Sequence, residues 1–194
     1  MDHKKFIQES CEESSQTKLA IARDCADDIS RAIETIKTAY RAKKKLLFCG
    51  NGGSAADAQH LATEMMIRLG HDVKRPALGA ISLCTDPSNM TAAGNDIGFE
   101  NVFARNVEGL GNEGDVLIGI STSGNSKNVI LAFEKAKQLK MKTIGFLGTG
   151  GGKMKPLCDV AIVVPSSNVQ RIQEGHIMIG HIIFETVEQE LYSN

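Results

Sequence analysis

Short apolar runs alternate with helical patterns along residues 46–191, and this alternation constrains the fold more than any other feature of the sequence. Five runs have the length and composition of buried strands, at residues 46–49, 77–83, 116–120, 143–147 and 160–164. Apolar residues at helical spacing lie between or after most of them, at about 54–68, 98–109, 126–139 and 169–191. Strands that alternate with helices predict an α/β three-layer sandwich around a central, mainly parallel five-stranded sheet.

Two long helices are predicted ahead of the first strand, at about 4–25 and 28–43. No repeat, linker or low-complexity segment divides the chain, so we expect one domain over residues 1–194. Within it, residues 1–43 form the leading helices, and residues 44–194 form the sandwich and the C-terminal helix. That last helix is apolar on more than one side, which predicts burial either between subunits or between the sheet and the first helix.

Composition excludes several classes of function. Lys and Arg number 22 against 23 Asp and Glu, so the chain lacks the basic excess of a nucleic-acid-binding protein. No apolar run approaches the roughly 20 residues of a membrane span. The polar N-terminus lacks the apolar stretch of a signal peptide, so we expect a cytoplasmic protein with no membrane partner. Five scattered cysteines without a C-x-x-C pair argue against a disulfide framework and a cysteine zinc site.

Two predicted strands end in loops suited to binding an anion. The loop at residues 50–55 is rich in glycine, and the loop at residues 120–126 is rich in hydroxyl side chains. The hydroxyl residues of the second loop are Ser121, Thr122, Ser123 and Ser126. Each loop precedes a helix, whose free N–H groups and dipole favour a phosphate. Capping and turn chemistry also favours Ser, Thr, Asn and Gly, but two such loops on neighbouring strands favour a phosphate monoester site.

Two glycine patterns resemble nucleotide-binding motifs without meeting their requirements. Gly50, Gly52 and Ala55 fit the degenerate dinucleotide fingerprint, but no acidic residue ends the next predicted strand at the required distance. The run at residues 148–153 resembles a P-loop, but its glycine spacing is wrong and Met154 replaces Ser or Thr. Neither pattern supports a nucleotide site.

Polar residues interrupt two of the predicted helices. His60 and Glu64 are four residues apart and share a helix face, as two metal ligands or an acid/base pair would, whereas Asp57 is expected to point elsewhere. Gln173 and His181 on the last helix are eight residues apart, about 12 Å along its axis. They converge on one ion only if both side chains lean inward; otherwise they serve different sites.

Four segments together resemble a known family, the phosphoheptose isomerases of the sugar isomerase (SIS) fold. They are residues 50–54 (GNGGS), 93–96 (AGND), 114–126 (GDVLIGISTSGNS) and 171–176 (RIQEGH). The likeness covers essentially the whole chain. It implies conversion of D-sedoheptulose 7-phosphate to D-glycero-D-manno-heptose 7-phosphate through an ene-diol, as the first step of ADP-heptose synthesis for lipopolysaccharide or related glycans.

The resemblance also implies roles for individual residues. The matching zinc ligands are His60, Glu64, Gln173 and His181, with one zinc per subunit, and the matching acid/base pair is Glu64 and His181. The residues that match substrate contacts are Asn51, Gly52, Gly53, Glu64, Asn95, Asp96, Ser121, Thr122, Ser123, Ser126 and Gln173. The family further implies a homotetramer with active sites between subunits.

A non-catalytic relative of the family is the alternative. This tetrameric SIS protein binds the replication initiator DnaA and lacks the Glu and His that match Glu64 and His181. Both residues are present here, and the loop sequence Ser-Thr-Ser-Gly also favours the enzyme. One departure is Gln170, where some isomerases carry an acidic residue; this leaves the sugar contacts there open.

Overall fold

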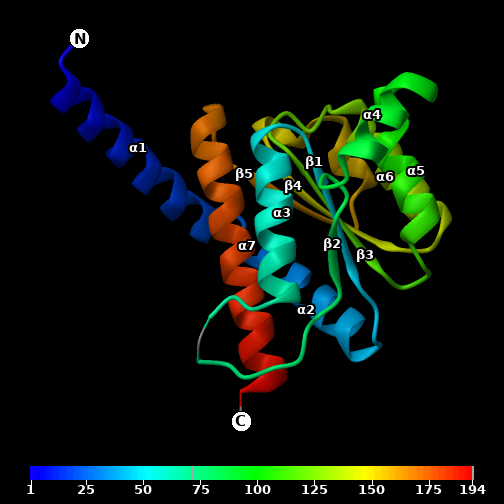
Figure 1. Cartoon of the computed structure of the whole chain (residues 1–194). Coiled ribbons are helices and arrows are strands. Elements are labelled where there is room, and N and C mark those ends of the chain that lie inside the picture. Colours follow the sequence, from blue (N-terminus) through cyan, green and yellow to red (C-terminus); the bar gives the residue numbers. More distant parts are fainter. Residues whose placement is uncertain (71, 194) are drawn as a thin grey trace.

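The computed structural model describes residues 1–70 and 72–193 of the chain. The helices are α1 (His3–Asp24), α2 (Ala26–Arg41), α3 (Gly53–Met66), α4 (Pro87–Asp96), α5 (Val102–Leu110), α6 (Lys127–Gln138) and α7 (Val169–Tyr192), with 3-10 segments η1 (Phe99–Asn101) and η2 (Thr149–Leu157). The strands are β1 (Leu46–Gly50), β2 (Ala80–Ser82), β3 (Val116–Ser121), β4 (Lys142–Gly148) and β5 (Val160–Val164). Figure 1 shows these elements in sequence colours.

The five strands form one sheet in the order β2-β1-β3-β4-β5, and every neighbouring pair is parallel. Strands β1, β3 and β4 are buried along almost their whole length, as expected for central strands covered on both faces. Strand β2 pairs with β1 over three residues at the sheet edge. The prediction of an α/β three-layer sandwich with two leading helices is confirmed.

Helices cover both faces of the sheet and divide the core into two layers. One apolar layer joins alternate strand residues such as Phe48 and Ile118 to α2, α3 and α7. The other joins the intervening residues, such as Leu47 and Leu117, to α4, α5 and α6. Helix α7 therefore packs on the sheet, beside α2 and α3 of the same chain. Its burial between subunits stays a prediction.

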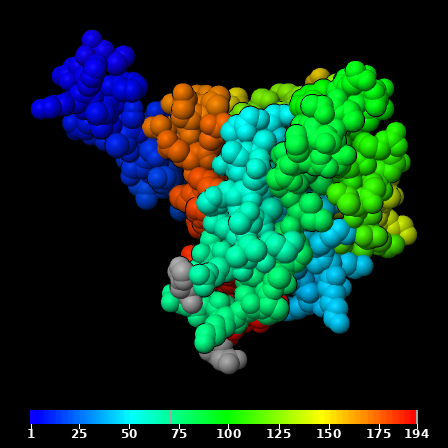
Figure 2. Space-filling view, in the orientation of Figure 1, coloured from blue at the N-terminus to red at the C-terminus, as the bar shows by residue number. Residues whose placement is uncertain are grey.

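Helix α1 stands away from the rest of the molecule over its N-terminal part (Figures 1 and 2). Its last turns pack against α7 through Ile21, while Phe6, Ile7 and Leu19 are exposed. No helix among the described residues is long and apolar enough to cross a membrane. All five cysteines are free thiols.

The sequence prediction missed two elements. Helix α4 begins with an N-cap at Asp86, whose carboxylate accepts hydrogen bonds from the Ser88 and Asn89 amides, and with Pro87 in its first turn. Segment η2 follows β4 and is interrupted at residues 150–152 by glycines with positive φ. The predicted strand at 77–83 is shorter in the structure, because only residues 80–82 pair with β1.

Candidate active site

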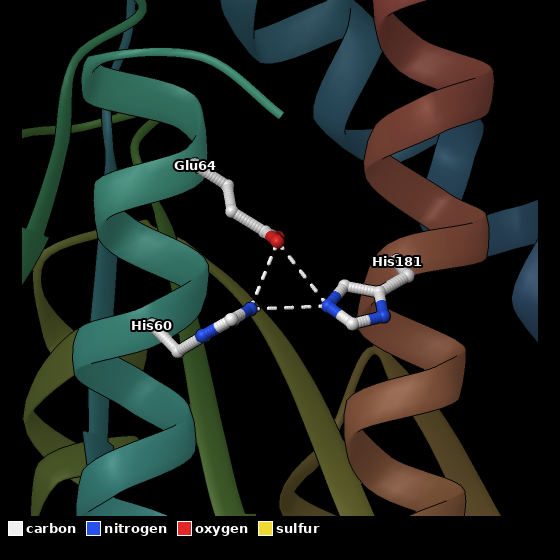
Figure 3. A group of neighbouring side chains, drawn as sticks. All are labelled: His60, Glu64 and His181. Carbon is white, nitrogen blue, oxygen red and sulfur yellow. Dashed lines mark hydrogen bonds and ion pairs between the residues drawn. The ribbon is translucent and has the colours of Figure 1, made fainter. Parts of the chain in front are cut away.

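Three side chains from two helices converge at the molecular surface (Figure 3). His60 and Glu64 lie one turn apart on α3, and His181 comes from α7. The His60 Nε2 atom lies 2.9 Å from Glu64 Oε1 and 3.1 Å from His181 Nε2, and the latter lies 3.2 Å from Glu64 Oε1. The Glu64 side chain is 13% exposed, whereas those of His60 and His181 are 53% and 43% exposed. The cluster is thus accessible through its two imidazoles.

The donor set fits a divalent metal. Tetrahedral zinc holds nitrogen and oxygen ligands at about 2.0–2.2 Å, which separates neighbouring ligand atoms by about 3.3 Å or slightly more. The three distances between the ligand atoms here, 2.9, 3.1 and 3.2 Å, come close to that spacing. Within the described residues, this is the one group of His, Cys, Asp and Glu side chains with such proximity. Glu64 Oε2 is buried without a hydrogen-bond partner among the described residues, and neither imidazole supplies one.

Close packing of α3 against α7 brings the three residues together. Gly180 faces Leu61, and a Cβ atom at Gly180 would lie 2.5 Å from Leu61 Cδ2. The two helices therefore approach closely one residue before His181 and one residue after His60. The i, i+4 spacing then directs both α3 side chains toward the facing helix.

Asp57 lies close enough to the cluster for the charges of His60 and His181 to act on it, although it is not among the three residues whose ligand atoms converge. It precedes His60 by three residues on α3, and its Oδ2 atom is buried with no hydrogen-bond partner among the described residues. Burial raises the pKa of the Asp57 carboxyl, while the nearby His60 and His181 oppose that shift. The i, i+3 spacing of Asp57 and His60 in the sequence indicates that the two residues are neighbours on the helix surface.

The glycine loop after β1 leads directly into α3. Gly52 has a φ of +56° and serves as the N-cap residue, a conformation that favours glycine. Gln173 of α7 lies over the first turn of α3, since a Cβ atom at Gly53 would lie 2.6 Å from its Nε2 atom. Gln173 is therefore placed at the start of α3, and His181 meets the same helix further along. A role for Gln173 as a fourth ligand stays a prediction.

The hydroxyl loop after β3 leads into α6 at the same edge of the sheet. Ser121 Oγ and Ser126 Oγ share a hydrogen bond of 3.0 Å, and Asn125 Nδ2 donates to the Ser123 carbonyl at 2.9 Å. Ser126 is the N-cap residue of α6, although its hydroxyl makes no capping hydrogen bond. Thr122 and Ser123 are half-buried and exposed, respectively, so this loop presents hydroxyls to solvent at a helix N-terminus.

The glycine run at residues 148–152 braces this hydroxyl loop. Gly124 has a φ of +63°, and a Cβ atom there would overlap the Gly151 carbonyl oxygen. The Met154 amide donates to the Gly124 carbonyl at 2.9 Å, and the Lys153 amide donates to Asn125 Oδ1 at 3.1 Å. The run that resembles a P-loop in sequence thus supports the backbone of the hydroxyl loop.

A reciprocal amide pair joins the glycine loop to the first turn of α6, directly after the hydroxyl loop, and the sequence did not reveal it. Asn51 Nδ2 donates to Asn128 Oδ1 at 2.9 Å, and Asn128 Nδ2 donates to Asn51 Oδ1 at 2.8 Å. Asn128 is buried, and its Oδ1 also accepts from the Val129 amide. The side-chain amide of Asn51 therefore uses one donor and its oxygen in this pair, which holds the glycine loop beside the hydroxyl loop.

Among the described residues, the side chains of Asn95 and Asp96 form no hydrogen bond with either loop. They end helix α4, where Asn95 Nδ2 donates to Asp96 Oδ1 at 2.6 Å, and both residues are exposed. In the described part of the chain, that is the one hydrogen bond that their side chains make. Their predicted substrate contacts stay a prediction.

His176, also on α7, lies inside the core. Its Nε2 atom donates to the Leu147 carbonyl at 3.1 Å, which ties α7 to β4 close to the hydroxyl loop. Burial lowers the pKa of His176 to about 4, so the ring is neutral near pH 7. It acts as a hydrogen-bonded core residue.

The family model for the SIS domain matches residues 11–148. A phosphoheptose isomerase from Clostridium acetobutylicum is 49% identical over 191 residues, which cover 97% of this chain and 96% of that protein. The chain belongs to the phosphoheptose isomerase family. This is a family of isomerase enzymes within the SIS fold, and the DnaA-binding alternative finds no support among these relatives.

Solved structures of phosphoheptose isomerases have the same fold. The enzyme from Neisseria gonorrhoeae superposes with a TM-score of 0.89 at 39% identity, covering 96% of this chain and 98% of that one. The enzyme from Francisella tularensis superposes with a TM-score of 0.93 at 36% identity, covering 97% and 100%. The likeness extends over both leading helices and the α7 helix that carries His181.

Proposed function

We propose that this phosphoheptose isomerase family member converts D-sedoheptulose 7-phosphate to D-glycero-D-manno-heptose 7-phosphate. The convergence of His60, Glu64 and His181 carries the proposal, because it supplies proton acceptors and donors where α7 meets the helix that begins at the glycine loop. His60 follows Gly53 by seven residues, about 10 Å along the helix axis. That separation suits a substrate whose phosphate and reacting carbons lie at opposite ends of a seven-carbon chain.

The two loops at the sheet edge would hold the sugar phosphate. The hydroxyls of Ser121, Thr122, Ser123 and Ser126 and the N-terminus of α6 would bind the phosphate. Asn51, Gly52 and Gly53, together with Gln173, would line the path from that anchor to Glu64, and Asn95 and Asp96 would contact the sugar. These assignments rest on the family resemblance. The position of the two loops and of Gln173 beside α3 supports all of them except those of Asn95 and Asp96.

The reaction relocates two protons, one from C1 to C2 and one from the C1 oxygen to the C2 oxygen, and requires no external oxidant. Glu64, as base, removes the proton from C1 of the ketose, and the C–H electrons form the C1=C2 bond of an ene-diol. His181, as acid, donates a proton to the C2 oxygen. Glu64 then returns its proton to C2, and His181 takes the proton of the C1 hydroxyl, which leaves an aldehyde at C1 and restores both groups. Oxidation at C1 thus balances reduction at C2.

Zinc fits the donor set of this site. His60, Glu64, Gln173 and His181 would hold it, and a bound zinc ion would polarise the substrate carbonyl as a Lewis acid or stabilise the cluster. Glu64 would then be both ligand and base, which lowers its basicity. The buried, unpartnered Glu64 Oε2 supports a site completed by a further charged group.

The product would feed ADP-heptose synthesis for lipopolysaccharide or related glycans, in the cytoplasm, where phosphorylated sugars are made. We further propose a homotetramer with active sites between subunits. Exposed Phe6, Ile7 and Leu19 on the projecting α1 support contacts with further copies. Light scattering should then give about four times 20.9 kDa, and a stable monomer would contradict the assembly.

One assay tests the proposed function. Purified protein is incubated with D-sedoheptulose 7-phosphate and no NAD or ATP, with and without added zinc, and the aldose phosphate is measured. Turnover is expected, with Asn51→Asp and Ser123→Ala variants showing a raised KM. Absence of turnover in both metal conditions, together with binding to DnaA, would transfer the assignment to the non-catalytic relative.

A further inference from the structure

The C-terminus of α3 depends on an arginine from outside the helix. The last carbonyls of a helix have no intrahelical donors, and α3 carries no basic residue in its last turn. Arg75, from the connection between α3 and β2, supplies donors to two of them, and the Leu78 amide also donates to the Met65 carbonyl at 3.2 Å. The Arg75 Nη2 atom donates to the Glu64 carbonyl at 2.7 Å, and its Nη1 atom donates to the Met65 carbonyl at 2.8 Å. Arg75 thus holds the backbone of Glu64 itself.

The same guanidinium is tied to the helix that carries His181. Arg75 Nε donates to Glu188 Oε1 of α7 at 2.5 Å, and the Leu69 amide also reaches this oxygen, at 3.4 Å. The side chains of Arg75 and Glu188 are 1% and 4% exposed, so water neither screens the pair nor competes with it. Removing one charge of a buried pair is strongly destabilising, because the other charge stays buried without a partner.

Glu188 follows His181 by seven residues, which is about two turns of α7 and returns to the same helix face. The α3–α7 contact is therefore fixed at two points on either side of His181. One is the close approach of Gly180 and Leu61, and the other is the buried pair. An apolar contact tolerates sliding of one helix along the other, whereas the planar fork of Arg75 fixes the distance and direction of three acceptors.

We propose that Arg75 and Glu188 are positioning residues of the isomerase site, forming a buried clamp that holds Glu64 of α3 against His181 of α7. Neither side chain touches the reacting atoms. The proposal rests on the proposed function for its kinetic consequence, and on the three-residue cluster alone for its consequence on metal binding. Removing the clamp lets α3 and α7 shift, which separates Glu64 Oε1 from His181 Nε2.

The double variant Arg75→Met/Glu188→Met separates positioning from stability. It removes both buried charges together, so no unpaired charge remains and the fold retains apolar packing. Its Co²⁺ affinity is measured by visible absorption, alongside kcat, KM and urea unfolding. Loss of a supporting partner of a metal ligand typically lowers affinity or activity about 10–100-fold, and we expect that loss in Co²⁺ affinity and kcat with little change in KM.

A matched control perturbs α7 without touching α3. Lys37 of α2 pairs with Glu190, two residues beyond Glu188, and Lys37→Met removes that contact. This variant should keep the Co²⁺ affinity and kcat of the unmodified protein. If the double variant does not fold, Arg75→Lys serves instead, because lysine keeps the charge opposite Glu188 but lacks the fork that reaches both α3 carbonyls.

Each outcome decides the question. Unchanged Co²⁺ affinity and kcat in the folded double variant, or an equal loss in Lys37→Met, overturns the clamp and leaves the proposed function intact. Absence of Co²⁺ binding by the unmodified protein also overturns the clamp as a support for this cluster. If the unmodified protein binds Co²⁺ but does not isomerise the sugar, the proposed function fails, and the affinity measurements still test the clamp.

Discussion

Replacing Gly124 by alanine tests whether the glycine run at residues 148–152 holds the hydroxyl loop in place. The new Cβ atom would overlap the Gly151 carbonyl oxygen and lie 2.9 Å from the Gly152 amide nitrogen, and these backbone atoms move only if one loop shifts. The φ of +63° adds about 1–2 kcal/mol for any residue with a Cβ atom, and overpacking of this kind costs about 1–3 kcal/mol. Gly124→Ala should therefore destabilise the protein by about 2–5 kcal/mol.

Gly150→Ala is the matched control, because Gly150 has a φ of +78° but a Cβ atom added to it would meet no other atom within 4 Å. It should cost only the backbone term, about 1–2 kcal/mol, and leave the KM for the sugar phosphate unchanged. In Gly124→Ala the displaced loop should also raise KM. Urea unfolding followed by circular dichroism and steady-state kinetics measure both effects. Equal destabilisation of the two variants with equal KM values would refute the supporting role of the glycine run.

Three further predictions concern the site and the core. Glu64→Gln should lower kcat by at least about 10²-fold while KM holds, with zinc content measured in parallel because loss of a ligand mimics loss of a base; normal turnover would exclude Glu64 as the base. Asn128→Asp replaces an amide donor with a second acceptor facing Asn51, and the lost hydrogen bond should cost about 1–3 kcal/mol in urea unfolding and raise KM; no change in either would mean that the amide pair does not hold the loops together. His176 has a native pKa of about 4 against about 6.5 unfolded, so the unfolded state binds the extra proton and stability falls as the pH drops from 6.5 toward 4, by about 2 kcal/mol at pH 5; His176→Gln should lack this part of the pH dependence, and identical pH profiles would contradict the assignment.

The sequence predicted the parts of the fold that local patterns encode. Apolar runs indicated four of the five strands within a residue or two at either end, because strands buried on both faces are nearly continuous apolar segments. The edge strand β2 was overextended, since the apolar run at 77–83 continues beyond the residues that find a partner in β1. Helix α4 was missed although Asp86 and Pro87 mark its start, because its own residues carry no apolar stripe.

In the candidate site too, the sequence predicted the local features and missed the contacts between residues distant in sequence. The i, i+4 spacing of His60 and Glu64 is a local signal, and the structure brings both residues to His181. The amide pair of Asn51 and Asn128 spans 77 residues, and the Arg75–Glu188 pair spans 113. No spacing rule links such residues, because the packing of whole helices and loops brings them together.

Proton transfer at Glu64 is the central claim, and deuterium incorporation tests it most directly. D-Sedoheptulose 7-phosphate is incubated with the protein in D₂O and followed by proton NMR, with Glu64→Gln as the paired sample. A base that exchanges its proton with solvent should place deuterium at C2 of the aldose product, and Glu64→Gln should form neither product nor exchanged ketose at a comparable rate. Equal incorporation by both proteins, or no aldose from either, would contradict the account.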